Sequence, residues 1–487
     1  MVVGLVLLGA AAAVAPPLYA GLAVAALAVL VWVLVRPEAG LYLLALSVPF
    51  QSLRGSDPTQ VTVTITEGVV ALAVAAFLVR QFSGVGATQQ SALSPQPSAL
   101  SPQDSGLRTQ HSALSTQNSC WRSSPLIRPI LILLAAMLLS MFKANNQLQS
   151  LKEIAKWLEF LVVYWLAINQ LRERRKVALF LTALVIGVLA EAALGAAQVV
   201  LRLGPPEFLI GGLILRAYGT FGQPNPFAGY LNLCLPILIG VALFAESRAL
   251  RRWSWLAALG VAVVMITTLS RGAWLGFGVA LLVIGITASR RLGVWIWLAL
   301  LAVALVILAA VFGVIPFGIT ERVLAAFELA GVSLDNVTVE NFSAVQRLAF
   351  WQAGLNMFEN NPVLGVGIGN YIDAYPGYAA QGWETVLGHA HDYYLNTAAE
   401  TGLVGLAAYV ALLITAFRHV ARAVATAPRG VWYGVALGLL GSLTAISVHN
   451  LVDNMYVHGI PVLLGLLLAL ATIIGSFQHP DQLETSG

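Results

Sequence analysis

Apolar residues gather along this chain in long runs that are separated by short polar segments. A helix needs about 20 mostly apolar residues to cross the hydrocarbon core of a bilayer. Helices are favoured there because every backbone polar group must be paired within its own segment. The runs predict membrane-spanning helices over residues 2–15, 18–35, 39–52, 67–82, 127–143, 152–171, 177–201, 225–246, 254–270, 272–289, 293–318, 402–424, 431–450 and 459–477. We therefore expect an all-α, polytopic integral membrane protein with about 12–14 transmembrane helices.

Composition supports this prediction and excludes an ordinary soluble domain. Of the 487 residues, 59% are hydrophobic and only 10% are charged, and the mean hydropathy is +0.82. A soluble domain carries about 25% charged residues. A transmembrane β-barrel would instead show short segments of alternating hydrophobicity.

The basic residues predict the orientation of the helices. They follow alternate spans, at Arg36, Arg80, the run from Arg172 to Lys176, Arg248, Arg251, Arg252, Arg290, Arg291, Arg418, Arg422 and Arg429. Cytoplasmic loops carry an excess of Lys and Arg, so this alternation predicts that both termini lie in the cytoplasm. We expect the protein in the inner (plasma) membrane of the cell. The first run resembles the apolar core of a signal peptide, but no basic residue precedes it. We therefore expect it to remain as the first helix.

Three segments interrupt the rhythm of spans. Residues 83–126 are polar and contain the repeat SALSPQ, SALSPQ, SALSTQ, which predicts a disordered cytoplasmic loop. Residues 203–224 form an outer loop with glycine and proline, and residues 319–401 form a long outer loop. The long loop is rich in aromatic residues, so we expect it to be folded, with a helix over 344–359. Its glycine-rich stretch 361–371 predicts a turn.

The expected organisation follows from these boundaries. It comprises N-terminal transmembrane helices over 1–82, the disordered loop over 83–126, central transmembrane helices over 127–318, the extracytoplasmic loop over 319–401, C-terminal transmembrane helices over 402–478 and a cytoplasmic tail over 479–487.

Two arginines stand out because they lie in outer segments at the membrane surface. Arg216 precedes the turn-forming sequence GTFGQPNP, and Arg271 lies in a very short turn between two spans. A guanidinium there is costly unless it meets a protein partner, a water-filled cavity or an anion, and its fork of donors matches phosphate oxygens. The alternative is an arginine that extends its charge to the interface without binding a ligand.

His391 is the candidate base. It lies in GHAHDYYLNTAAETGLVGL at the end of the long outer loop, where a neutral imidazole can accept a proton from a sugar hydroxyl. Asp392 and Glu400 are near enough in sequence to orient it. His389 is a competitor, and the HxH pattern also suggests a metal, although two histidines are an incomplete set. The alternative is a pair of ordinary loop histidines.

Arg216, Arg271 and His391 fall on the same, outer side of the membrane. The orientation of the helices is predicted from other basic residues, so this agreement is independent of it. Two arginines and a histidine at the outer surface suit a lipid diphosphate substrate, whose leaving-group charge the arginines would stabilise. Arg347, on the helix in the long loop, is a further substrate contact or a salt-bridge partner. Glu191, in the middle of a span, is a functional candidate by its position.

Other charged groups and the cysteines give weaker indications of function. Lys152, Glu153, Lys156 and Glu159 have helical spacings that suggest ion pairs, or a charged entrance to a groove. Asp453, His449 and His458 flank the last outer loop without an assigned partner. The formal net charge of +4 is scattered between spans and gives no reason to propose nucleic acid. Cys120 and Cys234 lie in a polar loop and a predicted helix, so neither a metal site nor a disulfide is expected.

At these residues the chain resembles the O-antigen ligase/O-antigen polymerase family. The resemblance rests on RAYGTFGQPNPFAGYL, TLSRGAWLG, NPVLGVGIGNY and HAHDYYLNTAAETGLVGL. The last is similar to the family's ligase signature, in which a histidine is followed by Asn, Ser or Gln, nine residues and Gly-x-x-Gly. The departure is Asp392 at the second position, which favours a polymerase relative to a ligase.

The resemblance implies a helical membrane glycosyltransferase whose donor is a glycan linked to undecaprenyl diphosphate. It implies transfer with inversion, without a metal or other cofactor, to an acceptor hydroxyl on a glycan or lipid. The family's essential histidine corresponds to His391 and its two essential arginines to Arg216 and Arg271. This spacing selects His391 over His389. The membrane lipids are the other expected partner.

Two other functions remain open at this stage. One is a polymerase of the same family, which builds an O-antigen or exopolysaccharide. The other, from a different class, is a small-anion transporter, which predicts polar residues along a path through the bilayer. The sequence names neither the sugar nor the acceptor.

Overall fold

The computed structural model describes residues 17–53, 64–82, 124–210, 212, 214–311, 334, 337, 342–385 and 388–477. Several predictions fall outside these residues. They are the first span (2–15), nearly all of the low-complexity loop including Cys120, most of the first part of the long outer loop (319–341), and the tail.

The described chain is almost entirely helical, which confirms the predicted fold class. Its α-helices are α2 (Pro17–Val35), α3 (Glu38–Ser47), α4 (Ile65–Phe82), α7 (Ile127–Met141), α8 (Gln147–Gln170), α9 (Arg174–Leu201), α10 (Pro224–Phe244), α11 (Arg248–Thr267), α12 (Arg271–Ala288), α13 (Arg290–Val311), α15 (Phe342–Asn360), α16 (Tyr371–Ala374), α17 (Tyr393–Thr426), α18 (Val431–His449) and α19 (Ile460–Gly475). Short 3-10 turns are η1 (Val48–Leu53), η2 (Pro206–Phe208) and η3 (Tyr375–Gly377). The strands β1 (Leu209–Ile210) and β2 (Ile214–Leu215) form one antiparallel pair.

Six of these helices are long and apolar enough to cross a membrane, namely α9, α10, α11, α12, α17 and α18. The apolar segments of α10 and α18 are 83% buried, whereas those of α11 and α12 are 28% buried. Large apolar side chains such as Leu256, Leu259 and Ile266 are exposed on α11. This distribution makes α10 and α18 the centre of the bundle and leaves α11 and α12 facing lipid. The protein is a multi-pass membrane protein.

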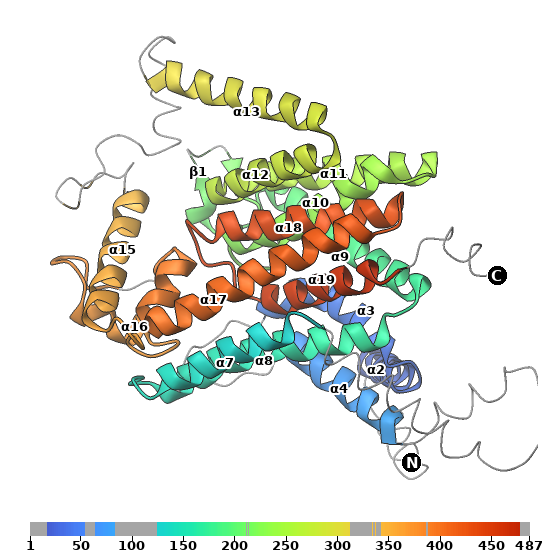
Figure 1. The fold of residues 1–487 in the computed structure, drawn as a ribbon, viewed down its shortest axis with the longest axis horizontal. Helices are drawn as coiled ribbons and strands as arrows, with labels where there is room; N and C mark the ends of the chain where they lie inside the picture. Colours follow the sequence, from blue (N-terminus) through green and yellow to red (C-terminus); the bar gives the residue numbers. More distant parts are fainter. Residues whose placement is uncertain are drawn as a thin grey trace, which may run out of the picture.

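The central pair packs closely because small residues line its interface. A Cβ atom added to Gly240 of α10 would overlap the backbone of Gly434, and one added to Gly438 would overlap that of Ile237. Small residues let two backbones approach where apolar burial gives no advantage over lipid. Figure 1 shows α10, α17, α18 and α19 running side by side through the middle of the molecule.

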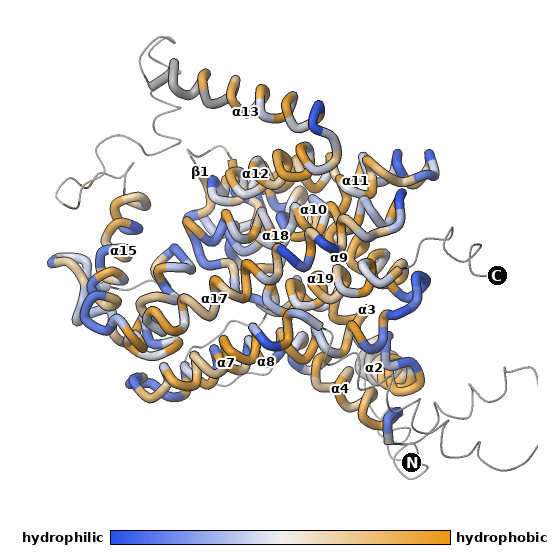
Figure 2. Tube along the Cα trace, in the orientation of Figure 1, coloured by the Kyte–Doolittle hydropathy of each residue, from blue (hydrophilic) through white to orange (hydrophobic). Residues whose placement is uncertain are grey.

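The helices place their connections at two opposite ends. The segments that precede α10, α12, α17 and α19 lie at one end, next to α15 and α16, on the left of Figure 1. The segments that precede α9, α11 and α18 lie at the other end. Figure 2 shows polar residues gathered at both ends and apolar residues between them. The end that carries α15 and α16 holds Arg216, Arg271 and His391 and is called the site end below.

Several helices begin earlier than the pattern of apolar residues predicts, and the difference is largest for α11 and α17. α11 begins at Arg248 and not at 254, because Ser247 caps it by accepting a hydrogen bond from the Leu250 backbone N–H. α17 begins at Tyr393 and not at 402, because Asp392 caps it. In both cases polar first turns are helical but lie outside the apolar run, so hydropathy alone does not detect them.

α17 contains a break at Gly402, where the backbone has φ 62° and ψ −163°. The glycine-rich turn 361–370 fills this break. The backbone N–H groups of Val366 and Gly367 donate to the carbonyls of Ala399 and Glu400 over 2.9 Å each. The predicted turn is therefore confirmed, and it fixes the first part of α17 at the site end. The predicted helix at 344–359 is confirmed as α15.

Candidate functional site

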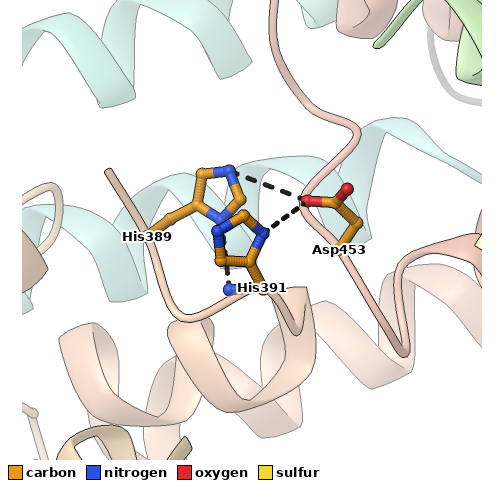
Figure 3. Close-up of side chains that lie close together, drawn as sticks. All are labelled: His389, His391 and Asp453. Carbon is orange, nitrogen blue, oxygen red and sulfur yellow. Dashed lines mark hydrogen bonds and ion pairs between the residues drawn. The ribbon is translucent and has the colours of Figure 1, made fainter. Parts of the chain in front are cut away.

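The residues of the candidate site meet around Asp453, in the loop between α18 and α19 (Figure 3). His391 Nδ1 lies 3.1 Å from Asp453 Oδ1, and His389 Nε2 lies 3.8 Å from the same oxygen. The Asp453 side chain is 6% exposed, whereas those of His389 and His391 are 25% and 23% exposed. The carboxylate is therefore buried behind two histidines that reach the surface of the site.

Asp453 is held in its ionised form. Burial raises its pKa, but the hydrogen bond from His391, followed by the electrostatic effect of the nearby His389 and His449 side chains, outweighs burial and holds the pKa well below its ordinary value. A carboxylate is only an acceptor, so the Nδ1 atom of His391 carries the proton of this hydrogen bond. In the neutral imidazole the lone pair is then on Nε2. Within the described residues no hydrogen-bond partner lies at Nε2, which leaves it open to a substrate.

The backbone at His391 supports this orientation. Its φ is 52°, in the left-handed region that non-glycine residues rarely adopt. The ring stacks on Phe350 of α15, with 5.7 Å between centroids and 10° between planes. Trp351 Nε1 donates to the His391 carbonyl over 3.4 Å. The long outer loop therefore holds the candidate base against the transmembrane bundle.

A chain of hydrogen bonds connects this carboxylate to Arg216. Asn225, in the first turn of α10, donates from Nδ2 to Asp453 Oδ2 over 2.7 Å. Its Oδ1 accepts from Arg216 Nη2 over 3.1 Å. Arg216 Nε also donates to the carbonyl of Thr268 over 2.8 Å. The direction of each bond is fixed, because a guanidinium only donates and a carboxylate only accepts.

Three arginines share this part of the site. Burial, followed by the nearby positive charges of Arg347 and Arg271, lowers the pKa of Arg216 to about 10, while Asp453 acts in the opposite direction. Guanidinium groups close enough to perturb one another in a half-buried site repel, and a bound anion would relieve that repulsion. The structure thus brings Arg216, Arg271 and Arg347, predicted from separate segments, into one positive cluster.

Glu191 explains how the Arg216 loop is held. Its carboxylate accepts from the Thr220 backbone N–H over 3.0 Å and from the Thr220 hydroxyl over 2.9 Å. Gln198, two turns further along α9, accepts from the N–H of Gly219 over 2.8 Å and donates to its carbonyl over 2.8 Å. The loop therefore folds back against α9. Glu191 supports the loop in the structure, and no described contact joins it to Arg216, Asp453 or His391.

The turn before α12 has a similar supporting arrangement. Leu269 has a φ of 51°, and Ser270 occupies the N-cap position of the helix that Arg271 begins. Ser270 Oγ lies 3.4 Å from His449 Nε2, at the end of α18. Small residues are needed here, because a Cβ atom on Gly272 would crowd the His449 ring at 2.7 Å. The turn thereby fixes Arg271 against the helix that leads into Asp453.

Asp392 and Glu400 do not contact the His391 ring in the described structure. Asp392 Oδ1 accepts from the backbone N–H groups of Tyr394 and Leu395, over 2.8 and 3.0 Å, and so caps α17. Glu400 is buried and accepts from the Tyr371 N–H over 3.1 Å. The sequence suggests Asp392 or Glu400 as the acid that orients His391, because both are close to it in the chain. In the structure Asp453 has this position. Arg347 has no ion pair among the described residues, so the predicted alternative of a salt bridge is not seen there.

The pattern HxH requires a test as a metal site. The ligand atoms of His389, His391 and Asp453 lie within 4.8 Å of one another. A metal-bound histidine usually donates its second ring N–H to an acceptor. His389 Nδ1 instead accepts from the His391 backbone N–H over 3.1 Å, which places its proton on Nε2 and directs that proton toward Asp453. Burial, followed by the proximity of His391, lowers the pKa of His389 to about 4, so this imidazole is neutral near pH 7. His391 therefore donates to the carboxylate, whereas His389 lies beside it with Nε2 3.8 Å from Asp453 Oδ1, beyond hydrogen-bond distance.

Sequence reasoning missed the roles of Asp453 and Asn225. Asp453 lies in an outer loop with two histidines, which is a signal, but 62 residues separate it from His391. Asn225 lies within GTFGQPNP, where each residue reads as a turn former or a helix start. Only contacts between distant segments identify either residue as part of the site.

Comparisons with known proteins agree with the predicted resemblance. Residues 256–410 match the family model described as O-antigen ligase. This segment includes Arg271, Arg347 and His391. A comparison with curated proteins finds no match. A similar solved structure, from a study titled "Structural coordination of polymerization and crosslinking by a peptidoglycan synthase complex", is 17% identical, has a TM-score of 0.40, and covers 72% of this chain and 95% of that chain.

Proposed function

We propose, from the O-antigen ligase match and the site around Asp453, that this protein is an inverting glycosyltransferase of the extracytoplasmic membrane surface. Its donor is a glycan linked to undecaprenyl diphosphate, and its acceptor is a hydroxyl on a glycan or lipid. The observation that carries the proposal is the joining of a positive cluster to an oriented histidine through Asn225 and Asp453.

The arginine cluster is the donor site in this proposal. Arg216, Arg271 and Arg347 bind the diphosphate, whose oxygens accept charge-assisted hydrogen bonds from guanidinium groups. When the bond from the anomeric carbon to the phosphate oxygen breaks, its electron pair stays on that oxygen. The arginines are already in position to stabilise this charge, so little reorganisation is required. This part of the mechanism needs no metal.

His391 is the base. Its Nε2 accepts the proton of the acceptor hydroxyl as the hydroxyl oxygen forms the new bond to the anomeric carbon. The resulting imidazolium is stabilised by Asp453, which already accepts the Nδ1 proton. The oxygen attacks from the face opposite the departing diphosphate, so the configuration inverts. The proton ends on His391 and the electron pair on the diphosphate.

The position of Asp392 supports a ligase as well as it supports a polymerase. The ligase signature has Asn, Ser or Gln there, and Asp392 serves as the N-cap of α17. Asn, Asp and Ser are about equally good N-caps, since each places a side-chain oxygen against the first free N–H groups. The departure therefore leaves this structural role intact. We propose the ligase-like reaction and keep the polymerase as its alternative.

The test is His391→Ala in a host from which the gene has been deleted, with His419→Ala as the matched control. His419 lies on α17 far from the site and bonds Thr472 over 2.8 Å. We expect the His391 variant to insert normally and to leave the lipid-linked glycan untransferred, while the control restores surface glycan. Normal surface glycan in the His391 variant would refute the proposal.

The reaction product distinguishes between the possible acceptors and between the rival functions. Glycan attached as one block to a lipid acceptor indicates a ligase, and a ladder of longer lipid-linked chains indicates a polymerase. Uptake of a labelled anion into vesicles, with no change in glycan on deletion, would support the transporter and refute the transferase.

A further inference from the structure

A second feature lies at the end of the bundle opposite the site. A partly open cavity of about 700 Å³ lies among α9, α10, α11 and α18. α9 lines it through 178–189, α11 through 250–257 and α18 through 431–435, which belong to the first part of each helix, and α10 lines it through the last part of its length. α10 and α18, whose other ends adjoin the loops of Arg216 and Asp453, therefore form this cavity away from the site end.

The lining of the cavity is hydrocarbon and indole with few polar groups. Thr182, Ser254 and Cys234 supply its hydroxyl and thiol groups, and no charged side chain lines it. Trp253 and Trp432 lie in the first two turns of α11 and α18, where indole rings favour the boundary between lipid and headgroups. A cavity of this chemistry excludes sugars and nucleotides and accepts a hydrocarbon chain.

Arginines lie at the starts of three of the lining helices. Arg174 and Arg175 begin α9, Arg248, Arg251 and Arg252 lie in the first turns of α11, and Arg429 lies two residues before α18; together they are called the basic rim here. Two acids share these segments: Glu173 pairs with Lys176 over 2.8 Å, and Glu246 lies against Gly430. Arg252 stands one helical turn before Leu256, which lines the cavity, and Arg248 one turn before Arg252. The rim therefore places positive charge at the helix starts that lead into the apolar cavity.

We propose that this cavity is a binding site for an anionic glycerophospholipid, with an acyl chain inside the cavity and the phosphate headgroup on the basic rim. Charge complementarity decides the occupant. Basic residues at a membrane surface attract anionic headgroups, and guanidinium groups form paired hydrogen bonds to phosphate oxygens. A zwitterionic lipid offers the same chain but a neutral headgroup. The site is separate from the transfer chemistry, and it lies in the cytoplasmic leaflet of the proposed topology.

The experiment measures lipid retained by the full-length protein after extraction in mild detergent. Phosphatidylglycerol and phosphatidylcholine with identical acyl chains are titrated separately, and bound lipid is counted by native mass spectrometry. We expect the wild-type protein to hold phosphatidylglycerol at least fivefold more tightly than phosphatidylcholine. Equal retention of the two lipids would overturn the proposal.

Separate variants test the headgroup part and the acyl-chain part of the proposed lipid site. Arg248→Gln with Arg252→Gln removes part of the rim, and we expect it to lose the preference for phosphatidylglycerol. Arg290→Gln with Arg291→Gln is the matched control, because these arginines begin α13, which does not line the cavity, and it should behave as wild type. Ala257→Phe fills the cavity and should reduce retention of both lipids. A rim variant with unchanged preference would overturn the headgroup assignment.

A polyprenyl chain is the rival occupant, and competition separates it from the phospholipid. Undecaprenyl phosphate is added to protein loaded with phosphatidylglycerol. Displacement at concentrations below those at which phosphatidylglycerol itself exchanges would overturn the proposal, whereas no displacement supports it. Because the readout is binding, a failure here leaves the glycosyltransferase proposal untouched, and a failure of transfer leaves the lipid site untouched.

Discussion

Replacing Asp453 with asparagine keeps the shape of the side chain but disrupts the order of donors and acceptors between Arg216 and His391. The carboxylate accepts on both oxygens, from His391 and from Asn225. The amide of D453N accepts on one side only. If its oxygen faces His391, its N–H groups face the N–H groups of Asn225. If it is flipped, its N–H groups face His391 Nδ1 and drive the proton to Nε2, which removes the lone pair that acts as the base.

The size of the effect follows from the charge that is lost. As His391 takes the proton, its ring charge lies about 4 Å from the Asp453 carboxylate, and two charges at that separation attract by about 4 kcal/mol at an effective dielectric constant of about 20. That energy corresponds to about a thousandfold in rate. Nδ1 and Oδ1 are 3.1 Å apart, and the ring charge is centred slightly further away. We therefore expect D453N to lower the transfer rate by about 10³-fold.

The companion variant N225D gives the prediction its control. Alone, it places a second carboxylate at the position where Asn225 Nδ2 now lies 2.7 Å from Asp453 Oδ2, and it should be strongly impaired. Combined with D453N, it restores a consistent chain: the new carboxylate accepts from Arg216 and from the new amide, whose oxygen faces His391. The double variant should recover at least tenfold of the rate that D453N loses.

The assay follows release of undecaprenyl diphosphate by purified protein with donor and acceptor present. Surface glycan in a deletion host reports the same step in cells. Each variant is accepted only if it elutes as a single species, since unfolding would mimic the loss. A D453N rate within threefold of wild type, or a double variant no faster than the slower single variant, would refute the hydrogen-bond reasoning.

Three further predictions concern the supports of the site. Glu191→Ala removes the acceptor of the Thr220 backbone N–H, while the Thr220 hydroxyl keeps the Pro49 carbonyl as its acceptor. A buried donor left unpaired costs about 1–3 kcal/mol, so both the melting temperature in detergent and the transfer rate should fall, and unchanged transfer would contradict the supporting role. Gly402→Ala should lower the free energy of unfolding by about 3 kcal/mol or more, because φ 62° with ψ −163° suits only glycine and the added Cβ atom would overlap the backbone of Val363. The control is Gly260→Ala, which has open space around it and should be neutral or stabilising. The pKa of His389 is about 4 in the folded state against an ordinary 6.5, so the folded state binds fewer protons than the unfolded state between these pH values, and stability falls as the pH drops from about 6.5 to 4. Measured by thermal unfolding, His389→Gln should lose less stability over that range than the wild-type protein. Equal losses would show that another group is responsible.

Much of the architecture was determined by the sequence alone. Runs of apolar residues identified the membrane class and the helices, because a bilayer permits few alternatives to a paired helical backbone. Spacing also located α15 and the glycine turn at 361–370. Helix starts were predicted less well, as at Ser247 and Asp392, because a capped first turn is polar and gives no apolar signal.

The candidate residues Arg216, Arg271 and His391 could be proposed from the sequence, because charges are costly at those membrane positions and turn chemistry surrounds them. Their connection was decided only by the tertiary structure. Asp453 and Asn225 join them through hydrogen bonds between segments that lie 62 and 228 residues apart in the chain. Such contacts depend on how α10, α17 and α18 pack, and packing follows from the small residues between helices and not from any local pattern. The sequence alone supplied the charged groups, and the packing of the helices decided which carboxylate orients the histidine.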